Sequence, residues 1–180
     1  VQARDADEIQ LFYVPSYACN FGCSYCYQDD YPKAIPADPS AVIDAFFRYV
    51  DKTFAGRSKY VTIFGGEPLL PIQDSRQSIR ALIDNSLPRS LDLAVVTNGY
   101  HLADYVPMLS KGRIREVQVT LDGPELVHDK RRMLKGGKGT FREIVAGIDA
   151  CLDAKIPVNL RAVVDRDNIN GLVDLAQFCI

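Results

Sequence analysis

The sequence lacks the features of membrane, secreted and nucleic-acid-binding proteins. No apolar run approaches the roughly 20 residues that a membrane span needs, and no signal-peptide pattern opens the chain. The formal net charge is only −2, with neither a broad basic field nor an acidic tail. We therefore expect no membrane segment, no nucleic-acid partner and no disordered binding region.

A complete disulfide framework is excluded as well. The sequence has five cysteines, and an odd count always leaves one thiol unpaired. Three of them, Cys19, Cys23 and Cys26, are crowded into one loop. This usage fits a reducing environment better than a secreted, disulfide-stabilised domain, so we expect a cytoplasmic protein.

The chain is long enough to bury a core. Its 180 residues are 47% hydrophobic, which fits one domain or a piece of one. It begins at Val1 rather than at a methionine, and its last residues resemble the middle of a helix. We therefore expect residues 1–180 to be one domain of a longer parent protein.

Short apolar, β-branched runs alternate with segments of helical periodicity along the chain. The predicted strands are Leu11–Val14, Tyr60–Phe64, Leu91–Val96, Glu116–Leu121 and Val158–Val164. Strands separated in this way form a parallel sheet that helices cover. The predicted fold is α/β with about five consecutive βα units, either an open doubly wound sheet or part of a barrel. In both, chemistry lies at the carboxyl ends of the strands.

Helices are predicted between and after these strands. Asp38 and Pro39 read as an N-cap followed by a first-turn proline. The apolar faces predicted for four helices are Val42, Ala45, Phe46 and Tyr49; Leu102, Tyr105, Val106 and Leu109; Phe141, Ile144, Val145, Ile148 and Leu152; and Leu172, Leu175 and Ala176.

The cysteine loop follows the first predicted strand and carries the clearest chemistry. Three close thiolates can hold a soft metal or a cubane iron–sulfur cluster, which normally takes four. Three protein ligands would leave one iron open to a ligand that is not protein. The alternative is a structural zinc site with His101 or His128 as the fourth ligand.

A second motif, Gly65-Gly66-Glu67-Pro68, follows the second predicted strand directly. Two glycines at a strand end let a ligand approach the backbone. The carboxylate of Glu67 and free strand-end carbonyls would together suit an ammonium group. The alternative is a plain turn with a solvated Glu67.

The two motifs in this order resemble the radical S-adenosylmethionine superfamily. Further matches are Thr97-Asn98-Gly99, Val119-Thr120-Leu121-Asp122-Gly123-Pro124, His128-Asp129, Arg132 and Gly139-Thr140-Phe141. The series is similar to the branch of anaerobic sulfatase-maturating enzymes and peptide-modifying maturases. The likeness runs from Tyr13 to about Asn168 and implies a partial (β/α)6 TIM-like barrel.

The resemblance implies an activity and its cofactors. A reduced [4Fe–4S] cluster would cleave S-adenosylmethionine to a 5′-deoxyadenosyl radical, which abstracts hydrogen from a substrate. In this branch the substrate is expected to be a peptide or protein side chain, and a reductase or flavodoxin-type protein would donate the electron.

The resemblance also implies residue roles. The metal ligands would be Cys19, Cys23 and Cys26, and the cofactor-binding residues would be Tyr25, Gly65, Gly66, Glu67, Asn98, Thr120 and Arg132, with Thr97 a further candidate. In this scheme Gly65–Glu67 contact the methionine ammonium and Tyr25 packs near the adenine. Thr120 and Arg132 bind the methionine carboxylate or the ribose, because arginine offers a planar, always-charged donor set.

The sequence departs from this branch in two places. A sixth strand and the cysteine motifs of the C-terminal auxiliary cluster domain are missing, and no catalytic acid or base can be assigned. Two other functions therefore stay open. One is a non-catalytic fragment or binding module with a structural iron–sulfur or zinc site, and the other is an electron-transfer protein.

The remaining candidates receive structural interpretations. His128 is expected to position a loop, and His101 to lie at the surface or at a helix start. Cys151 and Cys179 are expected to be small buried hydrophobes. Asp122 is expected to hold a turn with Gly123 and Pro124, and the alternative is that it lines the site. The basic run Lys130, Arg131, Arg132, Lys135 and Lys138 is expected to be a solvated loop, apart from Arg132.

Overall fold

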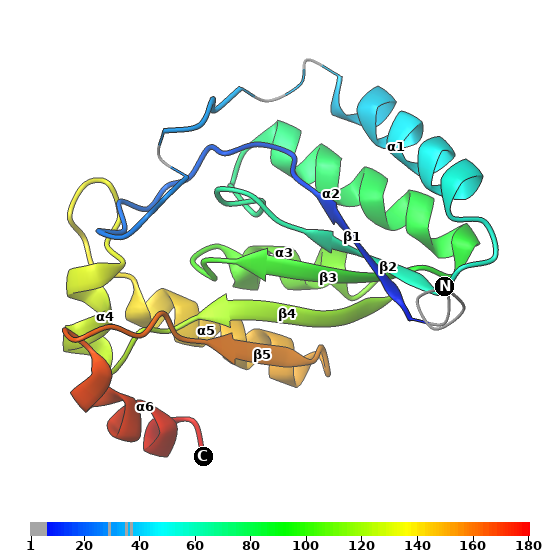
Figure 1. Cartoon of the computed structure of the whole chain (residues 1–180). Coiled ribbons are helices and arrows are strands. Elements are labelled where there is room, and N and C mark those ends of the chain that lie inside the picture. Colours follow the sequence, from blue (N-terminus) through cyan, green and yellow to red (C-terminus); the bar gives the residue numbers. More distant parts are fainter. Residues whose placement is uncertain (1–6, 29, 35, 37) are drawn as a thin grey trace.

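The computed structural model describes residues 7–28, 30–34, 36 and 38–180, and it contains a five-stranded parallel sheet. The strands are β1 (Ile9–Tyr13), β2 (Lys59–Ile63), β3 (Asp92–Thr97), β4 (Ile114–Thr120) and β5 (Val158–Arg161). Each strand pairs in parallel with the next in the sequence, in the order β1-β2-β3-β4-β5 (Figure 1).

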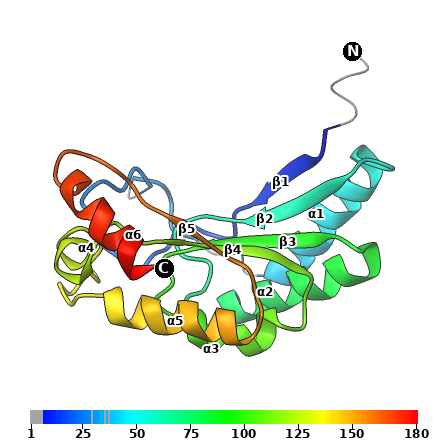
Figure 2. The ribbon, with the colours of Figure 1, turned by 90° about the horizontal axis from the view of Figure 1, so that it is seen from below.

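This strand order decides between the two predicted architectures. A doubly wound sheet reverses its strand order at a switch point and carries helices on both faces. Here the order never reverses, and α2, α3 and α5 all lie on one side of the sheet (Figure 2). The sheet is therefore part of a TIM-like barrel wall, and the alternative of an open doubly wound sheet is wrong.

Six α-helices accompany the strands in the described part of the chain. They are α1 (Pro39–Thr53), α2 (Gln73–Ser86), α3 (Leu102–Leu109), α4 (Glu125–Arg131), α5 (Phe141–Asp153) and α6 (Leu172–Phe178), with short 3-10 turns η2 (Leu87–Arg89) and η3 (Ile169–Gly171). The sequence analysis did not identify α2 or α4. The buried face of α2 includes Ser75, Ser78 and Ser86, and the buried residues of α4 are His128 and Arg131. Helix α4 has no apolar stripe, whereas α2 buries Ile79, Leu82 and Ile83 at helical spacing, a short stripe that the prediction missed.

The predicted apolar face of α1 is wrong by one position. The N-cap is confirmed, because the Asp38 carboxylate accepts a hydrogen bond from the Ala41 amide at 3.0 Å. The buried side chains, however, are Ile43, Phe47 and Val50, whereas Tyr49 is 59% exposed. The helix has two overlapping apolar stripes, and the sequence pattern alone could not say which one faces the sheet.

The later helices need smaller corrections. Leu152 is exposed, and the face of α5 is completed by Cys151, which is fully buried as expected, and by Gly147. A Cβ on Gly147 would lie 2.9 Å from the Leu102 Cβ, so the glycine lets α5 pack closely on α3. The prediction that Cys179 is buried is wrong, since α6 buries only Leu175.

The core lies between the sheet and the helices. The strand residues that face the helices, among them Val61, Ile63, Leu93, Val95, Val117 and Val119, are all 0% exposed. On the opposite face the sheet is more open, and Phe12 of β1 is 56% exposed. None of the helices in the described ranges combines the length and the apolar character that crossing a bilayer requires.

The strand ends leave room for a site. β5 ends at Arg161 rather than at the predicted Val164, because the Val163 amide donates to the Asp122 carboxylate instead of extending the ladder. The segment after β1 and the helix α4 both lie at the end of the sheet toward which the strand arrows point (Figure 1).

Candidate functional site

A cavity of about 320 Å³ lies at the carboxyl ends of the strands. Its lining includes all but one of the predicted site residues, namely Cys19, Cys23, Cys26, Tyr25, Gly65, Gly66, Asn98, Thr120 and Arg132. Thr97 lines it too, and so do Arg161 and Val163 from the end of β5. Glu67 does not. Residues distant in sequence are therefore brought together as the parallel-sheet prediction required.

The two glycines after β2 support the segment that leads into the cysteine loop. The Gly66 amide donates to the Ser16 carbonyl at 3.0 Å, and the Glu67 amide donates to the Ala18 carbonyl at 2.8 Å. A Cβ on Gly66 would lie 2.4 Å from the carbonyl oxygens of both Tyr17 and Ala18. Glycine is therefore required here for the approach of one backbone to another, while Gly65 and Gly66 still line the cavity.

The other side of the cysteine loop pairs with the segment after α4. Phe21 and Leu134 form an isolated antiparallel bridge. The Gly22 amide donates to the Met133 carbonyl at 2.9 Å, and the Lys135 amide donates to the Asn20 carbonyl at 3.0 Å. The loop is thus held between the strand ends and a segment that the sequence analysis had expected to be a solvated loop. The side chains of Lys130, Lys135 and Lys138 are exposed as expected, but Arg131 is buried.

Glu67 acts inside the protein rather than at the cavity surface. Its carboxylate accepts hydrogen bonds from the Leu69 amide at 2.8 Å, the Thr97 hydroxyl at 2.7 Å and the Asn98 amide at 2.6 Å. Burial raises the pKa of Glu67, and these donors oppose that rise. A solvated Glu67 in a plain turn is therefore wrong, and the side chain joins the end of β2 to the end of β3.

We expect the substitution Glu67→Gln to lower the free energy of unfolding by about 1–3 kcal/mol, because the new amide group would face a buried N–H or O–H donor. Urea denaturation of both proteins measures this. Glu143→Gln is the matched control, since Glu143 forms its ion pair with the exposed Lys138, and its effect should stay below about 1 kcal/mol. A Glu67→Gln protein as stable as the wild type would contradict this role.

Asn98 also stabilises the cysteine loop. Its side-chain amide donates to the Asn20 side-chain oxygen at 2.8 Å, and its own oxygen accepts from the Tyr100 amide at 3.0 Å. The amide nitrogen lies 3.9 Å from the Cys19 sulfur. Asn98 therefore fixes the turn at Cys19 and lines the cavity at the same time.

Arg132 gives the cavity a positive charge. The side chain is 8% exposed, and its Nη1 donates to the Tyr25 hydroxyl at 2.7 Å. Its Nε is buried and has no hydrogen-bond partner among the described residues. The hydroxyl of Thr120, at the end of β4, likewise has no hydrogen-bond partner within the described part of the chain, although the residue lines the cavity. Both groups suit an anionic or polar ligand.

A chain of hydrogen bonds fixes the backbone at Arg132. The Asp122 amide donates to His128 Nδ1 at 3.2 Å, so Nε2 carries the proton and donates to the Thr140 hydroxyl at 3.2 Å. That hydroxyl donates to the Arg132 carbonyl at 2.6 Å. Burial lowers the pKa of His128 to about 4, which keeps the ring neutral. The expected positioning role of His128 is therefore confirmed.

The three cysteines fit a cluster better than a single metal ion. Burial raises the pKa of the Cys19 thiol to about 11, and it also raises the pKa of Cys23. Cationic iron would offset this cost of ionising the thiols. Among the described residues, no three His, Cys, Asp or Glu side chains converge as ligands of one ion would. A cubane, by contrast, takes each thiolate on a different iron.

The histidines do not support the zinc alternative. Both ring nitrogens of His128 are engaged away from the cavity. His101 precedes α3, as expected, and its ring lies 3.7 Å from the Asp104 carboxylate. Neither histidine lines the cavity.

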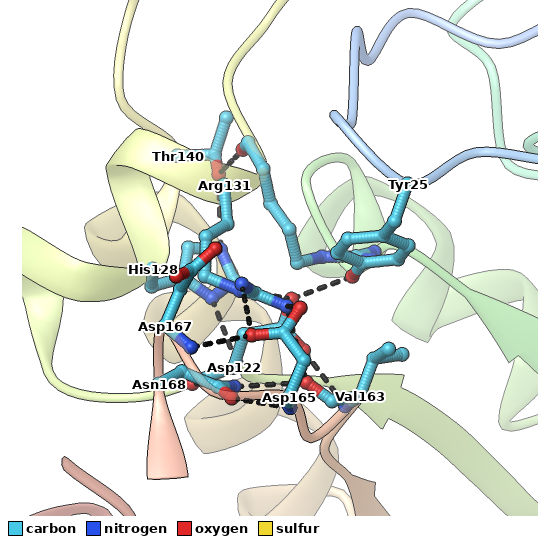
Figure 3. Close-up of polar contacts among 10 residues, drawn as sticks. Tyr25, Asp122, His128, Arg131, Thr140, Val163, Asp165, Asp167 and Asn168 are labelled. Carbon is cyan, nitrogen blue, oxygen red and sulfur yellow. Dashed lines mark hydrogen bonds and ion pairs between the residues drawn. The ribbon is translucent and has the colours of Figure 1, made fainter. Parts of the chain in front are cut away.

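Sequence reasoning missed two residues behind the cavity wall, Asp122 and Arg131. Asp122 is 0% exposed, and its carboxylate contacts Tyr25, Arg131 and Val163 instead of holding a turn with Gly123 and Pro124 (Figure 3). Arg131 is 7% exposed and binds Asp165 through both terminal nitrogens. The only signal in the sequence was the position of Asp122 at a strand end, beside Thr120.

Known proteins with similar sequences belong to the family that the motifs resemble. The family model that matches is described as the Radical SAM superfamily and covers residues 13–179. The chain is 30% identical over 164 residues to a GTP 3',8-cyclase of Clostridium perfringens, which covers 88% of this chain and 48% of that protein. It is 34% identical over 173 residues to a GTP 3',8-cyclase of Cronobacter sakazakii, at 92% and 50% coverage. The chain thus spans about half the length of these relatives.

Solved structures share the fold. A structure of anSMEcpe with bound AdoMet matches with a TM-score of 0.80 and 20% identity, over 96% of this chain and 49% of that chain. Streptococcus suis SuiB matches with a TM-score of 0.70 and 16% identity, over 97% and 37%. At such identities these matches speak for the fold alone. With the family match across nearly its whole length, the chain belongs to the radical S-adenosylmethionine superfamily.

Proposed function

We propose that this chain is the cofactor-cleaving core of a radical S-adenosylmethionine enzyme. The single observation that carries the proposal is the meeting of Cys19, Cys23 and Cys26 with Arg132 and the Gly65-Gly66 backbone in one cavity. Members of this superfamily use a [4Fe–4S] cluster and S-adenosylmethionine, and they need a reductant. The cluster supplies the electron that splits the sulfonium into methionine and a 5′-deoxyadenosyl radical.

The residues of the chain hold and orient these groups. The three cysteines would ligate three irons, which leaves the fourth for the cofactor. The Arg132 guanidinium and the Thr120 hydroxyl offer donors to the methionine carboxylate. The backbone at Gly65 and Gly66 borders the cavity where the ammonium would lie, while Glu67 holds that backbone from behind. Tyr17, Phe21 and Phe64 contribute apolar lining that limits water.

The test is anaerobic reconstitution of the whole protein with iron and sulfide. We expect a reduced-cluster electron paramagnetic resonance signal whose g-values shift when S-adenosylmethionine is added, together with release of 5′-deoxyadenosine under dithionite. A non-catalytic binding module would give no 5′-deoxyadenosine, and an electron carrier would give a signal indifferent to the cofactor. Either result would overturn the proposal.

For the substrate we propose a peptide or protein side chain. Support comes from the ordered motif series and from the likeness to anSMEcpe, of which two solved structures have a bound peptide. A second candidate is GTP, because the sequence relatives are named GTP 3',8-cyclases. Support for GTP is a 30–34% identity that spans about half of those relatives.

Product analysis separates the two candidates. The whole protein is incubated with S-adenosylmethionine, dithionite and either GTP or a peptide encoded beside its gene, and the products are followed by mass spectrometry. Loss of hydrogen from the peptide, with GTP unchanged, supports the peptide. A cyclised nucleotide with the peptide unchanged would show that the substrate is GTP.

A further inference from the structure

The carboxylate of Asp122 is a junction between four segments of the chain (Figure 3). It lies at the end of β4 and is 0% exposed. Its Oδ2 accepts from the Tyr25 hydroxyl at 2.5 Å and lies 3.4 Å from Arg131 Nε. Its Oδ1 accepts from the Val163 amide at 2.9 Å. The cysteine loop, α4 and the segment after β5 therefore meet the end of β4 at one side chain.

This junction sets the direction of the Tyr25 hydroxyl. An ionised carboxylate only accepts hydrogen bonds, so the single proton of Tyr25 is given to Asp122. The hydroxyl lone pairs then face Arg132, whose Nη1 donates to them at 2.7 Å. Arg132 can only donate, and Asp122 fixes the torsion of the Tyr25 hydroxyl so that its lone pairs point toward Arg132.

The charged side chains around the junction form ion pairs with one another, except for Arg132. Arg131 pairs with Asp122 and, through both terminal nitrogens, with Asp165 at 3.0 and 2.9 Å. Arg132 forms no ion pair among the described residues; its guanidinium contacts the Tyr25 hydroxyl and the Phe21 ring. Its positive charge therefore remains available to an anion in the cavity that it lines.

We propose that Asp122 is a positioning residue that acts through Tyr25 to orient the Arg132 guanidinium for the carboxylate of S-adenosylmethionine. This inference rests on the proposed function. It assigns Asp122 a contribution to cofactor affinity, although Asp122 itself does not line the cavity. The Asp122 substitution to Asn makes this testable, because its amide group must face either the Tyr25 hydroxyl or the Val163 amide. Facing Tyr25, it would compete with Arg132 for the hydroxyl oxygen.

The experiment is a double-mutant cycle on the reconstituted whole protein. The dissociation constant of S-adenosylmethionine is measured by equilibrium dialysis for wild type, Asp122→Asn, Tyr25→Phe and the double variant, with the iron content of each. We expect each single variant to bind about tenfold more weakly with its iron retained. The double variant should bind no more weakly than Tyr25→Phe, because residues that act through one another are not additive.

The matched controls are Asp153→Asn and Tyr49→Phe, which change exposed residues outside the cavity and should leave the affinity unchanged. A double variant about a hundredfold weaker than wild type would show independent roles and overturn the inference. An Asp122→Asn protein that binds as tightly as wild type would do the same.

If Asp122→Asn fails to fold or to hold iron, Tyr25→Phe still decides the question. Wild-type affinity in Tyr25→Phe overturns the inference, since the proposed path to Arg132 passes through that hydroxyl. Failure of the proposed function looks different, because the wild-type protein itself would then bind no S-adenosylmethionine.

Discussion

Replacing Cys23 with alanine is expected to abolish the iron–sulfur cluster and with it all reductive cleavage of S-adenosylmethionine. A cubane held by only two of its three protein thiolates would leave two irons without protein ligands. We expect the iron content after reconstitution to fall from about four atoms per chain to near zero. The same result is expected for Cys19→Ala and Cys26→Ala. Iron and sulfide assays with visible absorption measure it.

Cys179→Ala is the matched control for these variants. Cys179 is exposed in the described structure and does not line the cavity, so its loss should leave the iron content and the cleavage rate unchanged. Circular dichroism of each apoprotein checks that a loss of iron does not come from unfolding. Full iron content and cleavage in Cys23→Ala would show that the cysteine loop is not the cluster site.

The positions of the cavity residues followed well from the sequence because strand ends are set by strong local signals. Runs such as Tyr60–Phe64 directly before Gly65-Gly66 locate the end of a strand within one or two residues. In a parallel sheet those ends share one edge. Strand ends therefore predicted that Gly65, Asn98 and Thr120 lie in one region, whereas the place of Arg132 came only from the family resemblance.

What the sequence could not show is which polar groups face inward. Glu67 is predicted to contact the ligand, but its carboxylate instead accepts hydrogen bonds from three protein groups behind the cavity wall. Arg131 and Arg132 are neighbours of the same type, yet only Arg132 lines the cavity. The choice depends on partners such as Asp165, more than 30 positions away. Local pattern carries no information about such a pairing.

The predictions of which helix residues are buried were wrong for a related reason. The residue spacing of α1 allows two overlapping stripes, and the contact with the sheet selects Ile43, Phe47 and Val50. In α2 the buried face combines Ile79, Leu82 and Ile83 with three serines, and the serines shorten the apolar pattern that the sequence shows. Burial by small or polar side chains is a property of the assembled fold.

Replacing Gly66 with alanine is expected to displace the backbone segment that leads into the cysteine loop. The added Cβ would lie 2.4 Å from two backbone carbonyl oxygens, those of Tyr17 and Ala18. Backbone cannot move aside as the end of a flexible side chain can, so the segment before Cys19 must shift. We expect the free energy of unfolding to fall by about 1–3 kcal/mol and S-adenosylmethionine to bind at least about tenfold more weakly, a change of about 1.4 kcal/mol.

Gly136→Ala is the matched control for Gly66→Ala, because a Cβ at Gly136 would meet nothing within 4 Å. Urea denaturation and equilibrium dialysis of the two variants separate their effects on stability and on affinity. A Gly66→Ala protein that keeps wild-type stability and affinity would mean that the Ser16–Ala18 segment accommodates the Cβ without moving the thiols, and it would contradict the need for glycine at this position. Loss of both would show that this glycine supports the cysteine loop, because the hydrogen bonds of the Gly66 and Glu67 amides depend on the close approach that only glycine permits.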